Sequence, residues 1–277
     1  MLTSARKDFG RRQRRWADGA GVEHDARGYV RELVANLWRP LAGEALAQFE
    51  RGSELTPGLT TPARLWSLGS SAALVANVFD YWRDRDNAPL VAALGLNGGT
   101  AEVRFEEPLP TGLEGDPPLA DVMLRWPSGR VAAIESKFGE WLVRRPRNKA
   151  VFKPKYFPPA REVWTEAGLV RCQALAADIQ QGRERFKFLH AAQLLKHALG
   201  LARSGVPDYR LVYLYYEWPG REAETHRSEL ERFAASLRPE LDLHALTYQA
   251  LFQRLRAEPS VAAEYCRYLE QRYFSAR

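Results

Sequence analysis

Three charged residues lie in two short runs whose other residues are typical of strands in a hydrophobic core. Asp121 is in LADVMLRW, and Glu135 and Lys137 are in RVAAIESKF, which follows it. A buried carboxylate is costly unless it has an ion-pair partner, a metal ion or a catalytic task. Two carboxylates and an ammonium group at one point could hold a divalent metal ion and act on a phosphate ester. The same three charges could also form a structural salt-bridge cluster.

The segment PSG between the two runs predicts how they pair. If PSG is a hairpin turn, Trp126 faces Arg130, and counting back along both strands places Asp121 opposite Glu135. Cross-strand partners lie on one face about 5 Å apart. Lys137 shares that face, because it is two residues beyond Glu135. Oxygen ligands with no His or Cys nearby favour Mg²⁺ or Mn²⁺ over zinc.

The rest of the chain predicts the elements that position these charges. Residues 101–138 are expected to form three strands, and DYRLVYLYYEW (208–218) a central strand. Apolar residues at helical spacing predict helices at 24–50 (interrupted at Pro40), 63–85, 162–184, 186–205 and 221–237. The order helix, three strands, helix, strand indicates an α/β fold around one sheet. His190 and His197 share one face of the fourth helix, but with no third ligand in the pattern we do not expect zinc.

Composition limits the functions of the chain. Its 277 residues are 45% hydrophobic and carry a net charge of +6. No apolar run is long enough to span a bilayer, and no apolar segment of a secretory signal follows the basic N-terminus. The two cysteines have neither CxxC spacing nor the pattern of a disulfide framework, which suits a reducing cytoplasm. Basic residues gather in the first fifteen positions and again at Arg144, Arg145, Arg147, Lys149, Lys153 and Lys155.

The second basic cluster is interleaved with Phe152, Tyr156 and Phe157. Cations among aromatic rings suit a surface that neutralises phosphates and stacks bases, so the cluster is predicted to bind nucleic acid. A solvated loop explains the same composition.

The hairpin also resembles a known signature. ADVMLRWPSGRVAAIESK resembles the D-(x)n-ExK motif of the PD-(D/E)xK, or restriction-endonuclease-like, nuclease superfamily, with Leu119-Ala120 where the family has a proline. The segments SSAALVANVFDYW, AIESKFGE and AAQLLKHALGL further resemble an uncharacterised bacterial branch of it. The resemblance implies a mixed central sheet in a core at about 62–218. It also implies a basic helical N-terminal extension at 1–60 and a nuclease domain with C-terminal helices at 61–277.

The resemblance implies roles for individual residues. Asp121 and Glu135 would hold Mg²⁺ or Mn²⁺ with the backbone carbonyl of Ser136, and Lys137 would orient or activate the attacking water. Gln193 matches a glutamine that many members carry on the helix after the third strand. Several relatives add an upstream acid, for which the candidates are Glu102, Glu106 and Asp80.

We therefore expect a cytoplasmic, metal-dependent nuclease that acts on DNA and not on membranes, with a homodimer left open. The first alternative is a protein that keeps the fold and binds nucleic acid without cutting it. The second is a structural or partner-binding protein in which the three charges form only a salt bridge.

Overall fold

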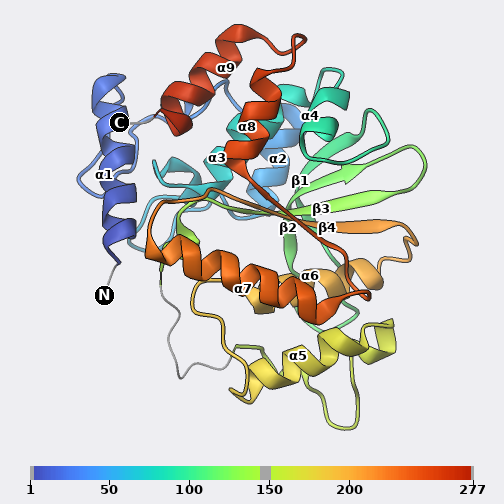
Figure 1. Ribbon diagram of the computed structural model, residues 1–277. Helices are drawn as coiled ribbons and strands as arrows, with labels where there is room; N and C mark the ends of the chain where they lie inside the picture. The colour runs from blue at the N-terminus through green and yellow to red at the C-terminus, as the bar shows by residue number, and fades with distance from the viewer. Residues whose placement is uncertain (1–2, 144–150, 276–277) are drawn as a thin grey trace.

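Five strands form one mixed sheet in the computed structural model, which describes residues 3–143 and 151–275. Their order across the sheet is β1-β2-β3-β4-β5 (Figure 1). The strands are β1 (Glu102–Pro108), β2 (Leu119–Arg125), β3 (Val131–Lys137), β4 (Tyr209–Tyr215) and β5 (Leu243–Thr247). β1, β2 and β3 pair antiparallel, whereas β3, β4 and β5 run parallel. The end of β1, the start of β2 and the end of β3 consequently meet at one edge of the sheet.

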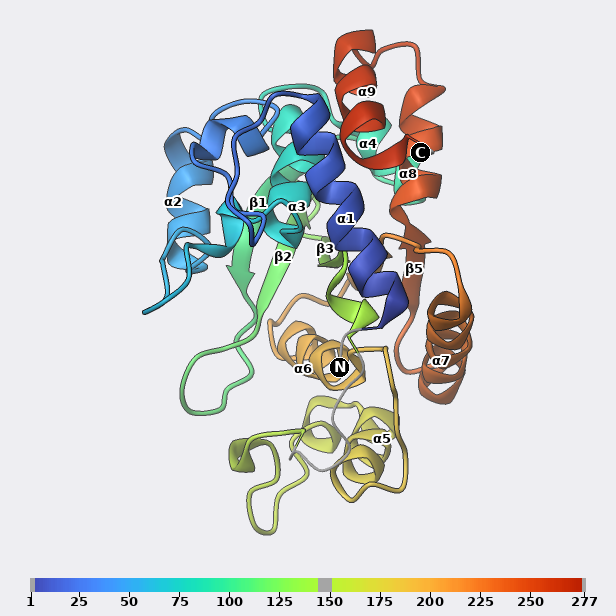
Figure 2. The same ribbon diagram turned by 90° about the vertical axis from the view of Figure 1, so that its left-hand side faces the viewer.

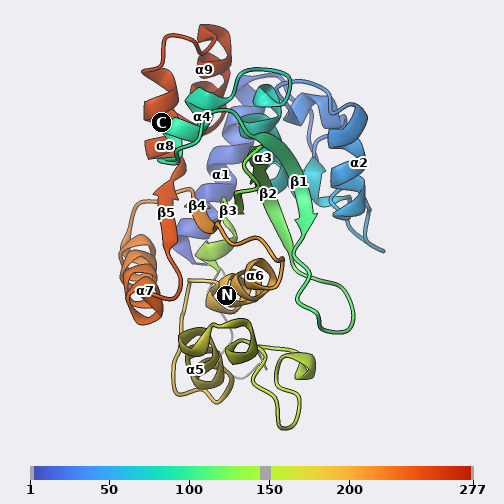
Figure 3. The same cartoon turned by 90° about the vertical axis from the view of Figure 1, so that its right-hand side faces the viewer.

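Helices cover both faces of this sheet (Figures 1 and 3). The α-helices are α1 (Ser4–Gly19), α2 (Gly43–Arg51), α3 (Ser71–Phe79), α4 (Ala88–Ala93), α5 (Val170–Gln180), α6 (Ala191–Ala202), α7 (Arg221–Leu237), α8 (Tyr248–Arg256) and α9 (Ala263–Leu269). Side chains of α5, α6 and α7 pack with Val131 and Ala133 of β3. Side chains of α1 to α4, α8 and α9 pack with Ala132 and Ile134 of the same strand. This alternation along β3 is the period of two that a strand buried on both faces requires.

The N-terminal helix belongs to the main core. Phe9 of α1 is buried, and its ring lies 4.7 Å from Phe138 and 5.7 Å from Trp218, centroid to centroid. α1 runs past α3 to the end of β3 (Figure 2). The division at residue 60 into an extension and a nuclease domain stays a prediction, although Phe9 and Phe49 share one core with the sheet.

The mixed α/β architecture and the three strands within 101–138 are confirmed. The helix predicted at 24–50 is wrong, because only α2 and the 3-10 turn Leu33–Asn36 form there. The carboxylate of Asp25 accepts the backbone N–H groups of Arg27 and Tyr29, both at 2.9 Å. These hydrogen bonds hold the start of the segment in a turn instead of a helix. The stretch LDLHAL, to which the sequence assigned no element, contributes the fifth strand. None of the helices in the described ranges is long and apolar enough to cross a membrane.

Candidate active site

The β2–β3 hairpin has the predicted register. The backbone N–H of Trp126 donates to the carbonyl of Arg130 at 3.0 Å, and Val122 pairs with Ile134. Gly129 has a φ of 87°, a left-handed conformation that glycine adopts at little cost. Extending this ladder by one residue places Asp121 opposite Glu135.

Glu135 and Lys137 are both buried in β3, with exposed fractions of 0% and 7%. Their side chains form an ion pair, which confirms that they share a face. Burial alone would lower the pKa of Lys137, but the carboxylates of Glu135 and Asp121 outweigh it and raise that pKa above its usual value. The lysine is therefore a fixed positive charge.

Asp121 is held against the same stretch of β3. Its Oδ2 accepts the backbone N–H of Ser136, the residue between Glu135 and Lys137, at 2.6 Å. Burial of the group and the nearby Glu135 carboxylate raise the pKa of Asp121, and Lys137 does not cancel them. Burial likewise raises the pKa of Glu135. One lysine thus under-compensates two carboxyl groups.

A third carboxyl group comes from β1. The pairs on either side of position 106 place Glu106 opposite Asp121. Glu106 has a φ of 48°, which non-glycine residues rarely adopt and which tends to mark functional positions. Its side chain packs on Gly52, where an added Cβ would collide with the Glu106 Cγ. Burial, followed by the charge of Asp121, raises the pKa of Glu106.

The other two upstream acids lie elsewhere. Glu102 is exposed and pairs with Arg104. Asp80 pairs with Arg39 at 2.6 Å and with Arg83 at 3.5 Å. Of the three candidates, Glu106 is the one that the structure brings to Asp121.

Glu54 is an acid of this cluster that the sequence did not indicate. It follows α2, is 7% exposed, and pairs with Arg64 at 2.8 Å. Burial raises the pKa of Glu54 to about 7, against the opposing charge of Arg64, and Asp121 adds to the shift. Its segment, RGSELTPGLTTP, has only the signals of a turn, so tertiary packing alone brings the acid here.

α6 covers the cluster from the other side. His197 is fully buried, and its Nδ1 lies 3.3 Å from Oε2 of Glu135, so the expectation of no histidine near the acids is wrong. Burial, with Lys137 and Lys196, lowers the pKa of His197 to about 3, which makes the ring neutral. Gln193 is one turn earlier on the same helical face. The four-residue spacing between Gln193 and His197 was the signal that could have placed the histidine at the site.

Comparison with known families decides what this arrangement belongs to. A sequence model of the family described as "Restriction Endonuclease associating with ARP" matches residues 5–274. The chain belongs to this restriction-endonuclease family. The predicted resemblance is thereby confirmed at the level of the family. No match was found among curated proteins or among solved structures.

The acids of this restriction-endonuclease chain suit a hard divalent cation. Carboxylate and carbonyl oxygens are the donors that Mg²⁺ and Mn²⁺ prefer. Within the described ranges, Oε2 of Glu135 is buried without a hydrogen-bond partner, since its 3.3 Å approach to Nδ1 of His197 does not have the geometry of a hydrogen bond. Such an orphaned oxygen, among carboxyl groups of raised pKa, is what a site short of positive charge should show. No three His, Cys, Asp or Glu side chains of the described residues are grouped as metal ligands, so a metal ion would be held here only after side chains turn.

The basic loop is only partly described. Arg144, Arg145, Arg147 and Lys149 lie outside the described residues. Lys153 is exposed. Lys155 donates to the backbone carbonyls of Glu114 and Asp116, at 2.5 and 3.1 Å, and so holds the β1–β2 connection.

The aromatic residues of that loop do not form a base-stacking surface. Phe152 and Tyr156 are buried, with exposed fractions of 3% and 4%, and pack with Trp164. Phe157 is half-buried against the same tryptophan. These rings are core residues because the loop folds back onto α5 and α6. The prediction that they stack on nucleic-acid bases is therefore wrong.

Proposed function

We propose that this chain has a restriction-endonuclease-like core and is a metal-dependent nuclease that hydrolyses phosphodiester bonds of DNA. The observation that carries the proposal is the meeting of Glu106, Asp121 and Glu135 beside Lys137 at one sheet edge, where three acidic groups face one lysine. A structural cluster is normally balanced, because each unpaired buried charge costs several kcal/mol. Excess acid instead suits a site that is completed by a cation.

Each residue has a role that its surroundings support. Asp121 and Glu135, with the carbonyl of Ser136, would hold Mg²⁺ or Mn²⁺, and Glu106 adds negative charge beside them. The bound ion would lower the pKa of a water molecule and offset charge that develops on the phosphate.

Lys137 stays protonated because two carboxylates surround it. It would orient the attacking water or donate to a phosphate oxygen, where a fixed charge stabilises the transition state more than the substrate. Gln193, on the face of α6 that carries His197, would donate its amide to the same water or phosphate.

One observation favours the rival that binds nucleic acid without cutting it. Glu135 already pairs directly with Lys137, and no three ligands are pre-grouped among the described residues. A site that has lost its catalytic activity and keeps a salt bridge would have both features. The proposed site is formed by residues of one chain, so it does not require a homodimer.

Supercoiled plasmid DNA tests the choice. Purified protein is incubated with plasmid in Mg²⁺, in Mn²⁺ and in EDTA, and nicked and linear forms are separated on a gel. The nuclease proposal expects conversion with either metal and none in EDTA. Intact plasmid with both metals, together with a gel shift of DNA, would contradict the nuclease proposal and favour a protein that binds nucleic acid without cutting it.

A further inference from the structure

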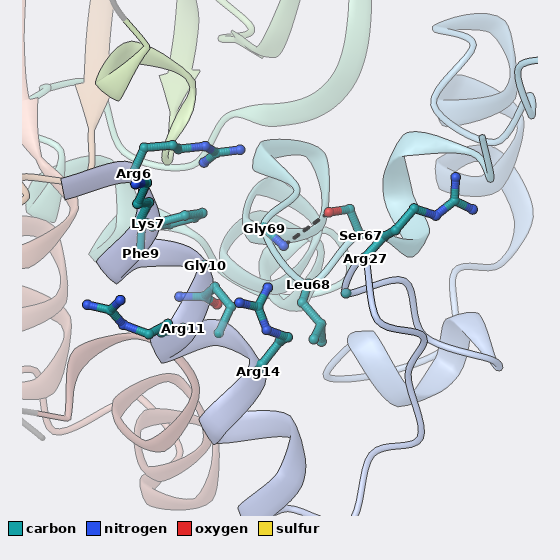
Figure 4. A pocket seen from close by; sticks show the side chains of 12 residues that line it. Arg6, Lys7, Phe9, Gly10, Arg11, Arg14, Arg27, Ser67, Leu68 and Gly69 are labelled. Atoms are coloured by element: carbon teal, nitrogen blue, oxygen red, sulfur yellow. Dashed lines mark hydrogen bonds between the residues drawn. The ribbon is translucent and has the colours of Figure 1, made fainter. Parts of the chain in front are cut away.

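A basic pocket lies between α1 and the turns that face it. It has a volume of about 520 Å³ and is open to solvent on one side. One wall is α1, with Arg6, Lys7 and Arg14, and the opposite wall contains Leu68 and Gly69 (Figure 4). Gly10 of α1 lies between the basic positions and leaves room for a ligand because it has no side chain. The proposed catalytic residues are not part of this pocket.

The protein neutralises the charge of the pocket only in part, since Glu140 acts on Arg6 from a distance without forming a salt bridge. Among the residues that the structure describes, no acidic residue lines the pocket. Arg11 and Arg27, which also border it, pair with Asp8 and Asp25 and point away from the space between the walls (Figure 4). Within the described ranges, Arg6, Lys7 and Arg14 have no salt-bridge partner, and the side chains of Arg6 and Arg14 extend toward the wall that contains Leu68 and Gly69 (Figure 4).

Arg6 ties the pocket to the end of β3. A Cβ added to Gly139, two residues after Lys137, would collide with a terminal nitrogen (Nη1) of Arg6. That nitrogen is buried and has no hydrogen-bond partner among the described residues. The hydroxyl of Thr3, just before α1, donates to the carbonyl of Leu142 at 2.9 Å. The pocket and the acid cluster are therefore joined by a few residues of backbone.

We propose that this pocket binds a phosphate group of the nucleic-acid strand whose backbone reaches the acid cluster. The proposal rests on the proposed function for the identity of the strand, but the binding it describes requires no cleavage. Arginine and lysine in a concave, acid-free site are the residues that hold phosphate oxygens. Their unpaired charge is what a strand needs to release its counterions. A solvated helix face would instead leave its cations on a convex surface.

Adjacent arginines of α1 provide a matched test. Arg14 lines the pocket, whereas Arg15 is exposed and does not. Arg14→Gln and Arg15→Gln remove the same charge from the same helix. Fluorescence anisotropy measures Kd for labelled oligonucleotides in EDTA, where no metal-dependent cleavage occurs, with melting temperature as the check on folding. Lys7→Gln combined with Arg14→Gln gives the larger effect.

The double variant should raise Kd about tenfold or more and reduce the slope of log Kd against log salt concentration by about 0.9 for each phosphate that is no longer neutralised. Arg15→Gln should change Kd by less than about twofold, in keeping with an exposed charge. Oligonucleotides with and without a 5′-phosphate distinguish a terminal phosphate from an internal one, and either pattern supports the proposal. Equal Kd for Arg14→Gln and Arg15→Gln would overturn it.

Inorganic phosphate is the remaining source of the same anion. If phosphate alone raises the melting temperature, Arg14→Gln removes that shift, and oligonucleotide affinity is unchanged, the pocket takes a free anion and the strand proposal is overturned. The proposed function fails separately: plasmid would stay intact in Mg²⁺ while Arg14→Gln still weakened binding. Plasmid cleavage by the wild type, with equal oligonucleotide affinities for Arg14→Gln and Arg15→Gln, would overturn only the proposal about the pocket.

Discussion

Glu135 is the residue at which the nuclease and the salt-bridge explanations predict opposite results. Glu135→Gln keeps the shape of the side chain and removes one negative charge. If the cluster holds a metal ion, cleavage should fall by a hundredfold or more (~3 kcal/mol of transition-state stabilisation), while DNA affinity stays the same or rises. Plasmid nicking rates and anisotropy measure the two quantities.

The salt-bridge explanation predicts a loss of stability instead. Glu135→Gln would leave Lys137 charged and buried without its partner, a change that typically costs about 3–5 kcal/mol. Glu102→Gln is the matched control, since Glu102 is exposed on β1 and pairs with Arg104 at the surface. An early-melting Glu135→Gln variant of a wild type that never cuts DNA would establish the structural role.

Lys137→Ala separates the lysine from the metal ligands. Cleavage should be lost, because the fixed charge beside the reacting water is gone. Magnesium binding should be retained or strengthened, since Glu135 loses the cation that competes for its carboxylate. Isothermal titration with Mg²⁺ measures this directly. Loss of metal binding together with cleavage would contradict the assigned role.

Spacing along the sequence was sufficient to place the charged residues of the hairpin at one site. It was not sufficient to identify the residues that surround them. Asp121, Glu135 and Lys137 could be placed because a tight turn fixes the register of both strands. Glu54 could not, because it reaches the cluster from a turn that lies far from the hairpin in the sequence. Glu106 was one of three candidates, with Asp80 the weakest, until the register of β1 placed it opposite Asp121.

At the scale of elements, α1 is predicted to be an integral part of the domain. Phe9 is 1% exposed and packs against Phe138, the residue after Lys137. Phe9→Ala should lower the free energy of unfolding by about 3–5 kcal/mol, because the ring is no longer buried and a cavity takes its place. Cleavage should fall as well, because α1 braces the end of β3. Chemical denaturation measures the change.

Leu59→Ala is the control for that substitution, since Leu59 is fully exposed and its removal should be nearly neutral. A cost below about 1 kcal/mol for Phe9→Ala, in the range of surface substitutions, would mean that α1 is a separate appendage.

The elements differ in how well their sequences predicted them. Strands β1 to β4 were predictable because alternating or continuous apolar runs end at Gly and Pro turns. The region 24–50 has helical periodicity, yet the side-chain hydrogen bonds of Asp25 and the proline at position 40 prevent a long helix. β5 was missed because five residues are too short a window for periodicity to show.

At the scale of the whole molecule, the acid cluster couples folding to pH. The pKa values of Glu54, Glu106 and Asp121 are all raised in the folded protein, chiefly by burial. The folded state therefore binds protons more tightly than the unfolded chain. For such groups the stabilisation is complete below the ordinary pKa and is lost as pH rises through the raised one. For Glu54 this window runs from about 4.5 to about 7, and the loss is on the order of 3 kcal/mol.

A divalent ion should reverse that loss, which gives a test of the metal site without cleavage. In EDTA, the melting temperature should fall as pH rises from about 5 to about 8, because these carboxyl groups lose their protons more readily in the unfolded chain than in the folded protein. Magnesium at a hundredfold excess over its Kd should restore about 2.7 kcal/mol. It should do so mainly at the higher pH, because protons compete for the same oxygens at the lower one. Glu106→Gln should flatten both the pH profile and the magnesium effect, whereas Glu102→Gln on the same strand should change neither. A magnesium shift that is absent, or equal at pH 5 and pH 8, would show that the carboxyl groups of this cluster do not hold the ion.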